Sequence, residues 1–125
     1  MLANIDVITM IGVSDMKKAR EFYEGVLGFE TIENMNDFVV GYRCGRSRVN
    51  VYVSQFTGTN KATTMMWNVG GDVARIAEKL AAKGVKFLHY EMPGMTLEGD
   101  VHIGNNHKVA WFTDPDGNIL SIGGR

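Results

Sequence analysis

Three histidines, His89, His102 and His107, are the side chains of this sequence best suited to bind a metal or to transfer a proton near neutral pH. His102 and His107 flank the residues Ile-Gly-Asn-Asn in a predicted loop, and His89 lies on a predicted strand before them. This spacing matches no standard zinc or iron motif, and metal sites usually add an acidic or thiolate partner at a fixed separation. We therefore interpret the histidines as surface or pocket-rim residues, with His102 placed to orient a polar ligand.

The only cysteine, Cys44, cannot form an internal disulfide. No base stands beside it in the sequence to activate its thiol, so we predict a buried or partly buried, inert side chain. A lone cysteine and an N-terminus without a signal-like apolar run favour a cytoplasmic location.

Strands and helices must position these side chains, and the clearest prediction is a hairpin over residues 109–122. Aromatic and β-branched residues lead into the cluster Asp-Pro-Asp-Gly-Asn at 114–118. In this cluster proline fixes its own φ near the turn value, glycine allows positive φ, and the Asx side chains bond nearby backbone amides.

The first half of the chain predicts the order β-α-β-β-β. A β-branched strand over 5–13 is followed by Ser14 and Asp15, which can cap a helix. The apolar residues of that helix fall on one side, and it ends at Gly28. Three further strands are predicted, over 29–33, 38–42 and 48–53.

The second half repeats this order. A strand over 63–69 precedes Asp72, a candidate cap, and a helix that stops at Gly84. A strand over 85–90, a long loop and the closing hairpin follow. The matching caps and stops indicate an internal repeat. We predict an α+β fold in which two β-α-β-β-β modules, 1–57 and 62–125, form a single domain.

The composition excludes several functional classes. With 125 residues, 45% hydrophobic and 22% charged, the sequence is typical of a globular protein and not of a disordered chain. The formal net charge is −1 and the basic residues are scattered, so we expect neither a nucleic-acid partner nor a membrane partner.

Two segments carry a resemblance to a known family. The first is 13–29, with Ser14-Asp15, Phe22-Tyr23 and Leu27-Gly28-Phe29, and the second is Trp111-Phe-Thr-Asp-Pro-Asp-Gly-Asn-Ile-Leu120. Over essentially its whole length the chain resembles the vicinal oxygen chelate superfamily of glyoxalases, bleomycin resistance proteins, fosfomycin resistance proteins and extradiol dioxygenases, and within it the short glyoxalase-like members. The resemblance implies paired modules whose curved sheets form a concave cleft for a ligand. It does not specify the reaction, because this scaffold hosts many functions.

The resemblance also identifies where a metal would bind. In metal-using relatives, side chains from the first, fifth and last strands provide the ligands. The family's spacing places Ile8, Thr64 and Ser121 at these positions. Isoleucine offers no lone pair, and hydroxyl groups are weak ligands for divalent cations. We therefore expect no metal and no cofactor.

In the family's register, strand alternation directs a mainly apolar and aromatic set of side chains toward the cleft, with a few hydrogen-bonding groups among them. Such a wall suits a flat organic molecule. The alternative, strongest for Ile8, Met66 and Ile119, is that these side chains fill a core. Trp67 has the opposite parity and is expected to pack under the second helix. The predicted ligand-binding residues are Ile8, Met10, Asn50, Tyr52, Thr64, Met66, Asn68, His102, Trp111 and Ser121.

Two connections leave their roles open. The stretch 91–102 is long for a loop, and its methionines suit either a lid over the cleft or a subunit contact. The bridge 55–60 has the same two interpretations. Small members of the family usually form dimers, so the resemblance implies a homodimer.

The leading functional hypothesis is a metal-independent protein that binds a small, partly aromatic molecule. The alternative is a glyoxalase-like lyase or isomerase acting on a small carbonyl compound or thiol adduct. Its acid–base chemistry would rest on His102, His89 or Asp6, because no carboxylate pair stands at an obvious spacing. A third hypothesis is a scaffold or regulatory module with a collapsed cleft.

Overall fold

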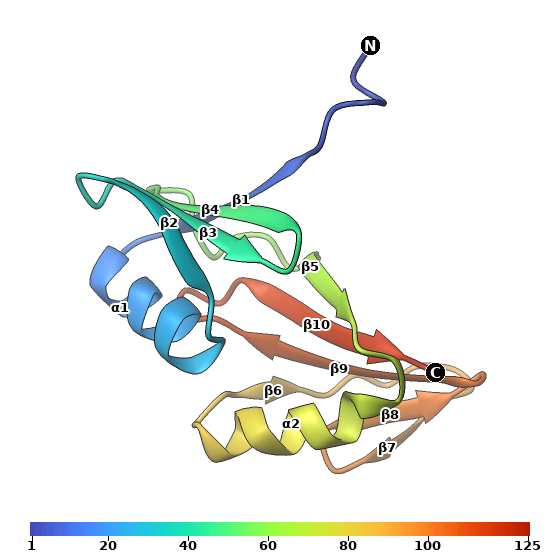
Figure 1. Cartoon of the computed structure of the whole chain (residues 1–125). Helices are drawn as coiled ribbons and strands as arrows, with labels where there is room; N and C mark the ends of the chain where they lie inside the picture. The colour runs from blue at the N-terminus through green and yellow to red at the C-terminus, as the bar shows by residue number, and fades with distance from the viewer. The chain divides into compact units, whose positions relative to one another are not determined.

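The computed structural model describes residues 1–125, which form two compact units, Met1–Gly58 and Thr59–Arg125. Each unit consists of a mixed β-sheet with a helical segment packed on one face (Figure 1). The sheets are open and do not close into barrels. The predicted α+β class is therefore confirmed, and each unit is described below by itself.

Unit 1 has a four-stranded sheet in the order β1-β4-β3-β2, with β1 parallel to β4 and the other pairs antiparallel. Its elements are β1 (Ile8–Val13), α1 (Met16–Arg20), η1 (Glu21–Val26), β2 (Glu30–Met35), β3 (Val39–Cys44) and β4 (Ser47–Val53). The predicted order of elements is confirmed, although β1 begins three residues later than expected, at Ile8.

The helical segment of unit 1 begins as predicted, where the Asp15 carboxylate accepts a hydrogen bond from the amide of Lys18 at 3.3 Å. It does not continue as one α-helix. From Glu21 to Val26 it is a π-helix, and the amide of Leu27 donates to the carbonyl of Phe22. The wider turns are not visible in a 3.6-residue pattern, which is why the sequence predicted a regular helix.

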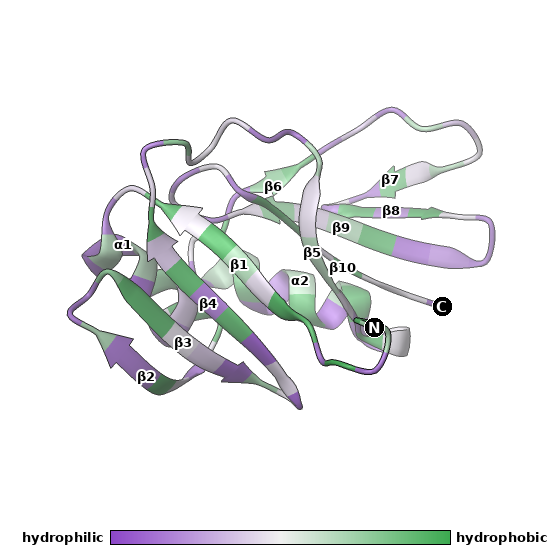
Figure 2. Cartoon of the chain, turned by 90° about the horizontal axis from the view of Figure 1, so that it is seen from above, coloured by the Kyte–Doolittle hydropathy of each residue, from purple (hydrophilic) through white to green (hydrophobic).

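The helix covers one face of the unit 1 sheet, which we call its helix face. Apolar and polar residues alternate along β4 (Figure 2), and the apolar residues Val49 and Val51 are buried on the helix face. Tyr42 pairs with Val49 and lies with its ring 6.4 Å from that of Tyr23, which fixes this face as the one under the helix. The opposite face of unit 1 carries the alternate residues Ile8, Met10, Arg48, Asn50, Tyr52, Val39 and Gly41, with Glu33 and Met35 of β2 paired beside them.

Unit 2 has a sheet in the order β5-β10-β9-β8-β7, and β6 pairs with β9 beside β8. Its elements are β5 (Thr63–Asn68), η2 (Gly70–Asp72), α2 (Val73–Ala82), β6 (Phe87–Leu88), β7 (Thr96–Glu98), β8 (Val101–Gly104), β9 (His107–Thr113) and β10 (Ile119–Gly124). Neither this helix nor the one in unit 1 is long and apolar enough to cross a bilayer.

The closing hairpin of unit 2 is confirmed. The buried carboxylate of Asp114 accepts hydrogen bonds from the amides of Asp116 and Asn118, both at 2.9 Å, and from the side-chain amide of Asn118 at 2.8 Å. One carboxylate thus holds the whole turn between β9 and β10, because it satisfies three donors at once.

The structure corrects three sequence predictions for unit 2. The stretch 91–102 is not a plain loop, because it contains β7 and the start of β8, joined as a hairpin. The predicted strand over 85–90 is reduced to Phe87–Leu88. Asp72 is the N-cap residue of α2, as predicted, but its side chain makes no cap hydrogen bond. It forms a 3.1 Å ion pair with Arg75 instead, and the hydrogen bond from Arg75 lowers the pKa of the Asp72 carboxyl.

The helix face of unit 2 carries Phe112, Leu120 and Ile122, all buried, and α2 packs against β8, β9 and β10. Trp67 also lies on this face, stacked on Phe112 with ring centroids 6.3 Å apart. The opposite face of unit 2 carries Met66, Asn68, Ile119, Ser121, Trp111, Leu88 and His102.

Candidate functional site

The predicted ligand-binding residues fall on the opposite face of each unit. In unit 1, Ile8 and Met10 are 48% and 51% exposed, while Asn50 and Tyr52 are partly exposed. Met10 pairs with Asn50 across the β1–β4 ladder, so apolar and hydrogen-bonding groups alternate on one accessible surface. Ile8 therefore does not fill a core.

A charged residue that the sequence analysis left out, Arg48, lies in the middle of this surface. Its Nε donates to Oδ1 of Asn50 at 2.9 Å, and its Nη2 forms a 2.8 Å ion pair with Glu33. To reach β2 the guanidinium lies over Gly41 of β3, where a Cβ atom would stand 2.7 Å from Nη2. Strand parity with Asn50 and Tyr52 could have placed Arg48 on this face from the sequence.

In unit 2, His102 is a buried residue and not the surface or rim histidine expected from the sequence, since it is only 1% exposed. Its Nε2 accepts a hydrogen bond from the amide of Tyr90 at 2.9 Å, which requires the proton of the neutral ring to sit on Nδ1. Nδ1 is buried without a partner in the protein. The His102 ring stands edge-on to Trp111, with centroids 4.9 Å apart.

The chain between β6 and β7 passes over this histidine. Besides the Tyr90 hydrogen bond, Gly94 approaches Gly104 of β8 so closely that a Cβ at position 104 would collide with the Gly94 carbonyl. Gly104 lies on the same side of β8 as His102. The segment 90–94 therefore covers the His102 end of the sheet, which accounts for the burial of this side chain.

The other predicted residues of unit 2 differ in accessibility. Met66 is 52% exposed, whereas Ser121 is buried. The β5–β10 ladder shifts register between Ile119 and Leu120, and it is Thr63, not Thr64, whose hydroxyl accepts a 3.2 Å hydrogen bond from Nε1 of Trp111. The side-chain oxygen of Asn68 accepts from the amide of Gly70.

The remaining histidines belong to no cluster of three or more side chains that could hold a metal ion. His89 forms a 2.8 Å contact from Nε2 to Oδ1 of Asp100, and His107 is exposed. No three His, Cys, Asp or Glu side chains gather in a way that could hold an ion. At the family's three ligand positions, Ile8 is an exposed aliphatic residue and Thr64 and Ser121 bring only hydroxyls, so these residues do not fit the family's metal.

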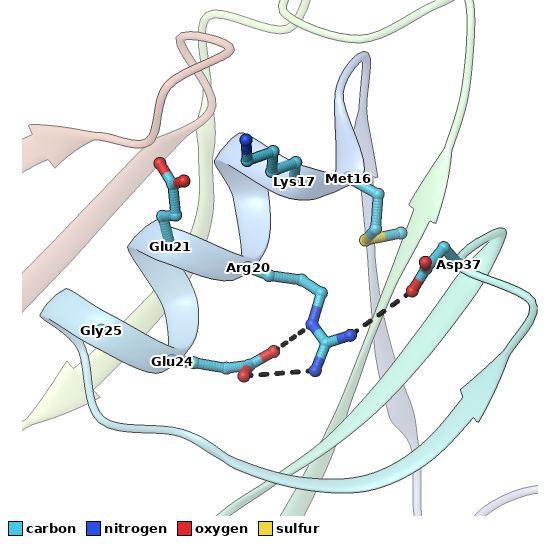
Figure 3. A pocket seen from close by; sticks show the side chains of 7 residues that line it. All are labelled: Met16, Lys17, Arg20, Glu21, Glu24, Gly25 and Asp37. Atoms are coloured by element: carbon cyan, nitrogen blue, oxygen red, sulfur yellow. Dashed lines mark hydrogen bonds and ion pairs between the residues drawn. The ribbon is translucent and has the colours of Figure 1, made fainter.

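A hollow of about 620 Å³ lies elsewhere on unit 1, beside α1 and η1, and five of its seven lining residues are charged (Figure 3). Its lining residues are Met16, Lys17, Arg20, Glu21, Glu24, Gly25 and Asp37.

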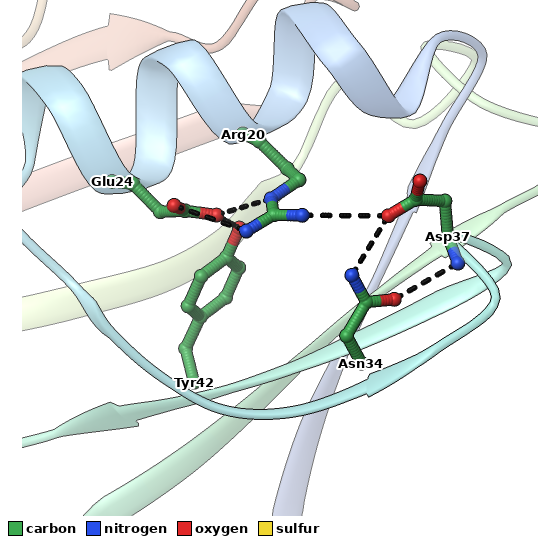
Figure 4. A network of polar contacts seen from close by, with 5 residues as sticks. All are labelled: Arg20, Glu24, Asn34, Asp37 and Tyr42. Carbon is green, nitrogen blue, oxygen red and sulfur yellow. Dashed lines mark hydrogen bonds and ion pairs between the residues drawn. The ribbon is translucent and has the colours of Figure 1, made fainter.

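The charged side chains at the centre of this hollow form ion pairs and hydrogen bonds with one another (Figure 4). Arg20 pairs with Glu24 at 2.5 Å and with Asp37 at 3.4 Å, and the Tyr42 hydroxyl donates to Glu24 at 2.7 Å. The Arg20 hydrogen bond lowers the pKa of the Glu24 carboxyl, and burial raises that of the Tyr42 phenol well above its ordinary value. This network ties the helix to β3, so we interpret it as structural.

Comparison of the sequence with known protein families identifies the class of protein to which this fold belongs. Residues 4–122 match the model of the Glyoxalase/Bleomycin resistance protein/Dioxygenase superfamily, so the chain belongs to this superfamily and the predicted resemblance is confirmed. Among curated proteins, no sequence matches the chain.

Solved structures show the same fold. Lactoylglutathione lyase from Agrobacterium tumefaciens is 18% identical, with a TM-score of 0.73 over 99% of this chain and 96% of its own. The fosfomycin resistance protein FosX from Mesorhizobium loti is 12% identical, with a TM-score of 0.70 over 100% and 94%. TnmS3, an antibiotic binding protein from Streptomyces sp. CB03234, is 18% identical, with a TM-score of 0.68 over 98% and 96%. At these identities the likeness establishes the fold alone.

Proposed function

We propose that this chain is a cytoplasmic, metal-independent member of its superfamily that binds a small, partly aromatic organic molecule. The observation that carries the proposal is the chemistry of the opposite face of unit 1. Where a metal ligand would stand, the face presents the exposed aliphatic side chain of Ile8, and beside it lie Met10, Asn50 and Tyr52. Accessible apolar groups with a few fixed polar groups are the usual composition of a small-molecule site.

The structural relatives include a protein solved with a metal ion, which is the first kind, and a protein described only as binding a small molecule, which is the second kind. One is described as a FosX from Listeria monocytogenes complexed with Mn(II), and another, TnmS3, as an antibiotic binding protein. The residues at positions 8, 64 and 121 favour the second kind for this chain, because they offer neither imidazole nor carboxylate.

Two measurements on chelator-treated protein test this proposal. First, Zn²⁺, Ni²⁺, Mn²⁺ and Fe²⁺ are offered and the retained metal is measured by mass spectrometry, and we expect none at stoichiometric level. Second, naphthalene-based compounds are titrated by calorimetry in the presence of chelator, and we expect saturable binding. Stoichiometric metal uptake, or aromatic binding that requires an added ion, would refute the proposal.

One observation favours a second candidate, a lyase or isomerase. His89 and Asp100 form a 2.8 Å imidazole–carboxylate pair, an arrangement that can support acid–base chemistry, and the His89 ring lies 6.4 Å from that of His102. Asp6, the other predicted participant, is exposed ahead of β1. Turnover of methylglyoxal with glutathione that is lost in His89→Gln would favour this candidate over simple binding.

We also propose that the protein is a homodimer. β1 is at the edge of the unit 1 sheet, where a second copy of the chain can pair with it. Light scattering coupled to size-exclusion chromatography should give the mass of two chains, and a monomeric mass across the micromolar range would contradict this.

A further inference from the structure

Arg48 has hydrogen-bonding capacity that the protein does not use. A guanidinium carries five N–H donors, and here Nε donates to Asn50 while Nη2 donates to Glu33. Nη1 donates to no protein group. The side chain is 34% exposed, so this edge of the cation is accessible to a ligand.

The guanidinium is also held in one place. The guanidinium is held by Asn50, which lies on the same strand, and by Glu33, which lies two strands away on β2. Gly41 has no side chain, and this leaves the space in which the guanidinium lies. A cation that is already ordered loses little conformational entropy when a ligand binds, so its contacts contribute more to affinity.

The same face also carries accessible apolar side chains, while the residues paired directly with Arg48 are Ile8 and Arg43. Met10 and Met35 are each more than half exposed, and Val39 and Tyr52 are partly exposed. Across the strands, Tyr52 pairs with Val39 and Val39 with Met35, so an apolar row runs beside the row that contains Asn50 and Gly41. A planar cation on the same face as two thioethers and an aromatic ring suits a ligand that is itself flat and aromatic.

The acidic groups near Arg48 do not block this role. Glu33 is engaged by Nη2, and Glu30, in the next row, lies 3.8 Å from Arg43. Each carboxylate on this side of the sheet thus has its own arginine, and the Nη1 edge remains for an acceptor supplied by the ligand.

We propose that Arg48 is the specificity-determining residue of the unit 1 face and that it selects a planar aromatic molecule carrying a carboxylate. The aromatic ring packs among Met10, Tyr52 and the guanidinium, and the carboxylate accepts hydrogen bonds from Nη1. This inference rests on the proposed small-molecule binding and adds the chemical class of the ligand.

The test is isothermal titration calorimetry of the full chain with chelator present and three probes. 2-Naphthoate has both features, 2-naphthylmethanol lacks the charge, and cyclohexanecarboxylate lacks the aromatic ring. We expect 2-naphthoate to bind about tenfold more tightly than either of the other two.

Two variants perturb the arginine in different ways. Arg48→Lys keeps the charge but removes the plane and the fork of donors, and should weaken 2-naphthoate binding about tenfold. Gly41→Ala leaves Arg48 in the chain but places a methyl group where Nη2 lies, and should weaken binding about fivefold by displacing the guanidinium. Because the displaced atom ends a flexible side chain, the fold tolerates this change.

Gly25→Ala is the matched control, because it adds a methyl group in η1 with nothing within 4 Å and should leave the affinity within about twofold of wild type. Equal affinities for the three probes, or unchanged 2-naphthoate binding in both Arg48→Lys and Gly41→Ala, would overturn the assignment to Arg48 while small-molecule binding stands. Failure of all three probes to bind would overturn the proposed function as well.

Discussion

At the scale of single residues, the contact between Glu24 and Tyr42 links the helical segment of unit 1 to β3. The Glu24 carboxylate also accepts hydrogen bonds from Arg20, which is the main reason that its pKa lies below the ordinary value of 4.5. A carboxyl whose pKa is lower in the folded state stabilises the protein above its unfolded pKa and loses this contribution as the pH falls through its folded pKa.

We therefore predict that Glu24→Gln reduces the stability at neutral pH and flattens its dependence on pH in acid, because the variant has no carboxyl to protonate. Urea unfolding of the two proteins at a series of pH values between about 3 and 7 measures this. If their free energies of unfolding differ by the same amount at every pH, the Glu24 carboxylate does not have the linked role described.

Asp114 is a second residue with a specific structural task, since one buried carboxylate accepts three hydrogen bonds in the turn before β10. Asp114→Ala should cost about 2–4 kcal/mol of unfolding free energy, because it leaves buried donors without an acceptor. Asp6→Ala, which changes an exposed aspartate, is the control and should cost less than about 0.5 kcal/mol in the same urea titration. A similar loss in both variants would show that the turn does not depend on this carboxylate.

Residue types predicted some of these roles and missed others. The Asp114 turn follows directly from its cluster of Asx, Pro and Gly residues. The Asp72 side chain pairs with Arg75 instead of capping the helix, and this could not be predicted from the residue type. The burial of His102 could not be predicted either, because it depends on the segment 90–94. Strand parity alone places Arg48 on its face, but its contacts with Glu33 and Gly41 join residues from different strands and could not be predicted.

At the scale of elements, the residues of the β8–β9 turn explain why this hairpin was not predicted from the sequence. Asn105 and Asn106 both have positive φ, 54° and 60°, as a two-residue type I′ turn requires. Asparagine tolerates this conformation less well than glycine, so the pair is a weaker signal than Asn-Gly. The three-residue β7 adds little hydrophobic pattern of its own.

Asn106→Gly should therefore stabilise the protein by about 0.5–1 kcal/mol, because it relieves the cost of positive φ at the second turn position. Thermal unfolding of this variant is compared with Asn4→Gly, which changes an asparagine that lacks positive φ and should bring no gain. A fall in the melting temperature of Asn106→Gly would contradict the turn assignment.

A second prediction concerns the segment that covers β8. Gly104→Ala would drive its methyl group into the Gly94 carbonyl, and neither backbone can yield easily. We expect a loss of about 1–3 kcal/mol and faster hydrogen exchange at the Tyr90 amide, whose acceptor is His102. Exchange at Tyr90 that matches wild type would mean that the segment is not held at this point.

At the scale of the whole molecule, the repeat of strand, helix and strands was evident from helix stops and turn residues, and the family model spans nearly the same residues. Function could not be predicted to the same depth. The same backbone serves enzymes and binding proteins, and the difference lies in a few side chains on the sheet faces. In this chain, we propose that those side chains are Ile8, Arg48, Thr64 and Ser121.

The most direct measurement of metal-independent binding is an amide NMR titration of chelator-treated protein with 2-naphthoate. We predict saturable chemical-shift changes in β1 and β4, centred on Met10 and Asn50, with no metal present. The opposite result, in which these amides stay unchanged until a divalent ion is added, would contradict the proposed function.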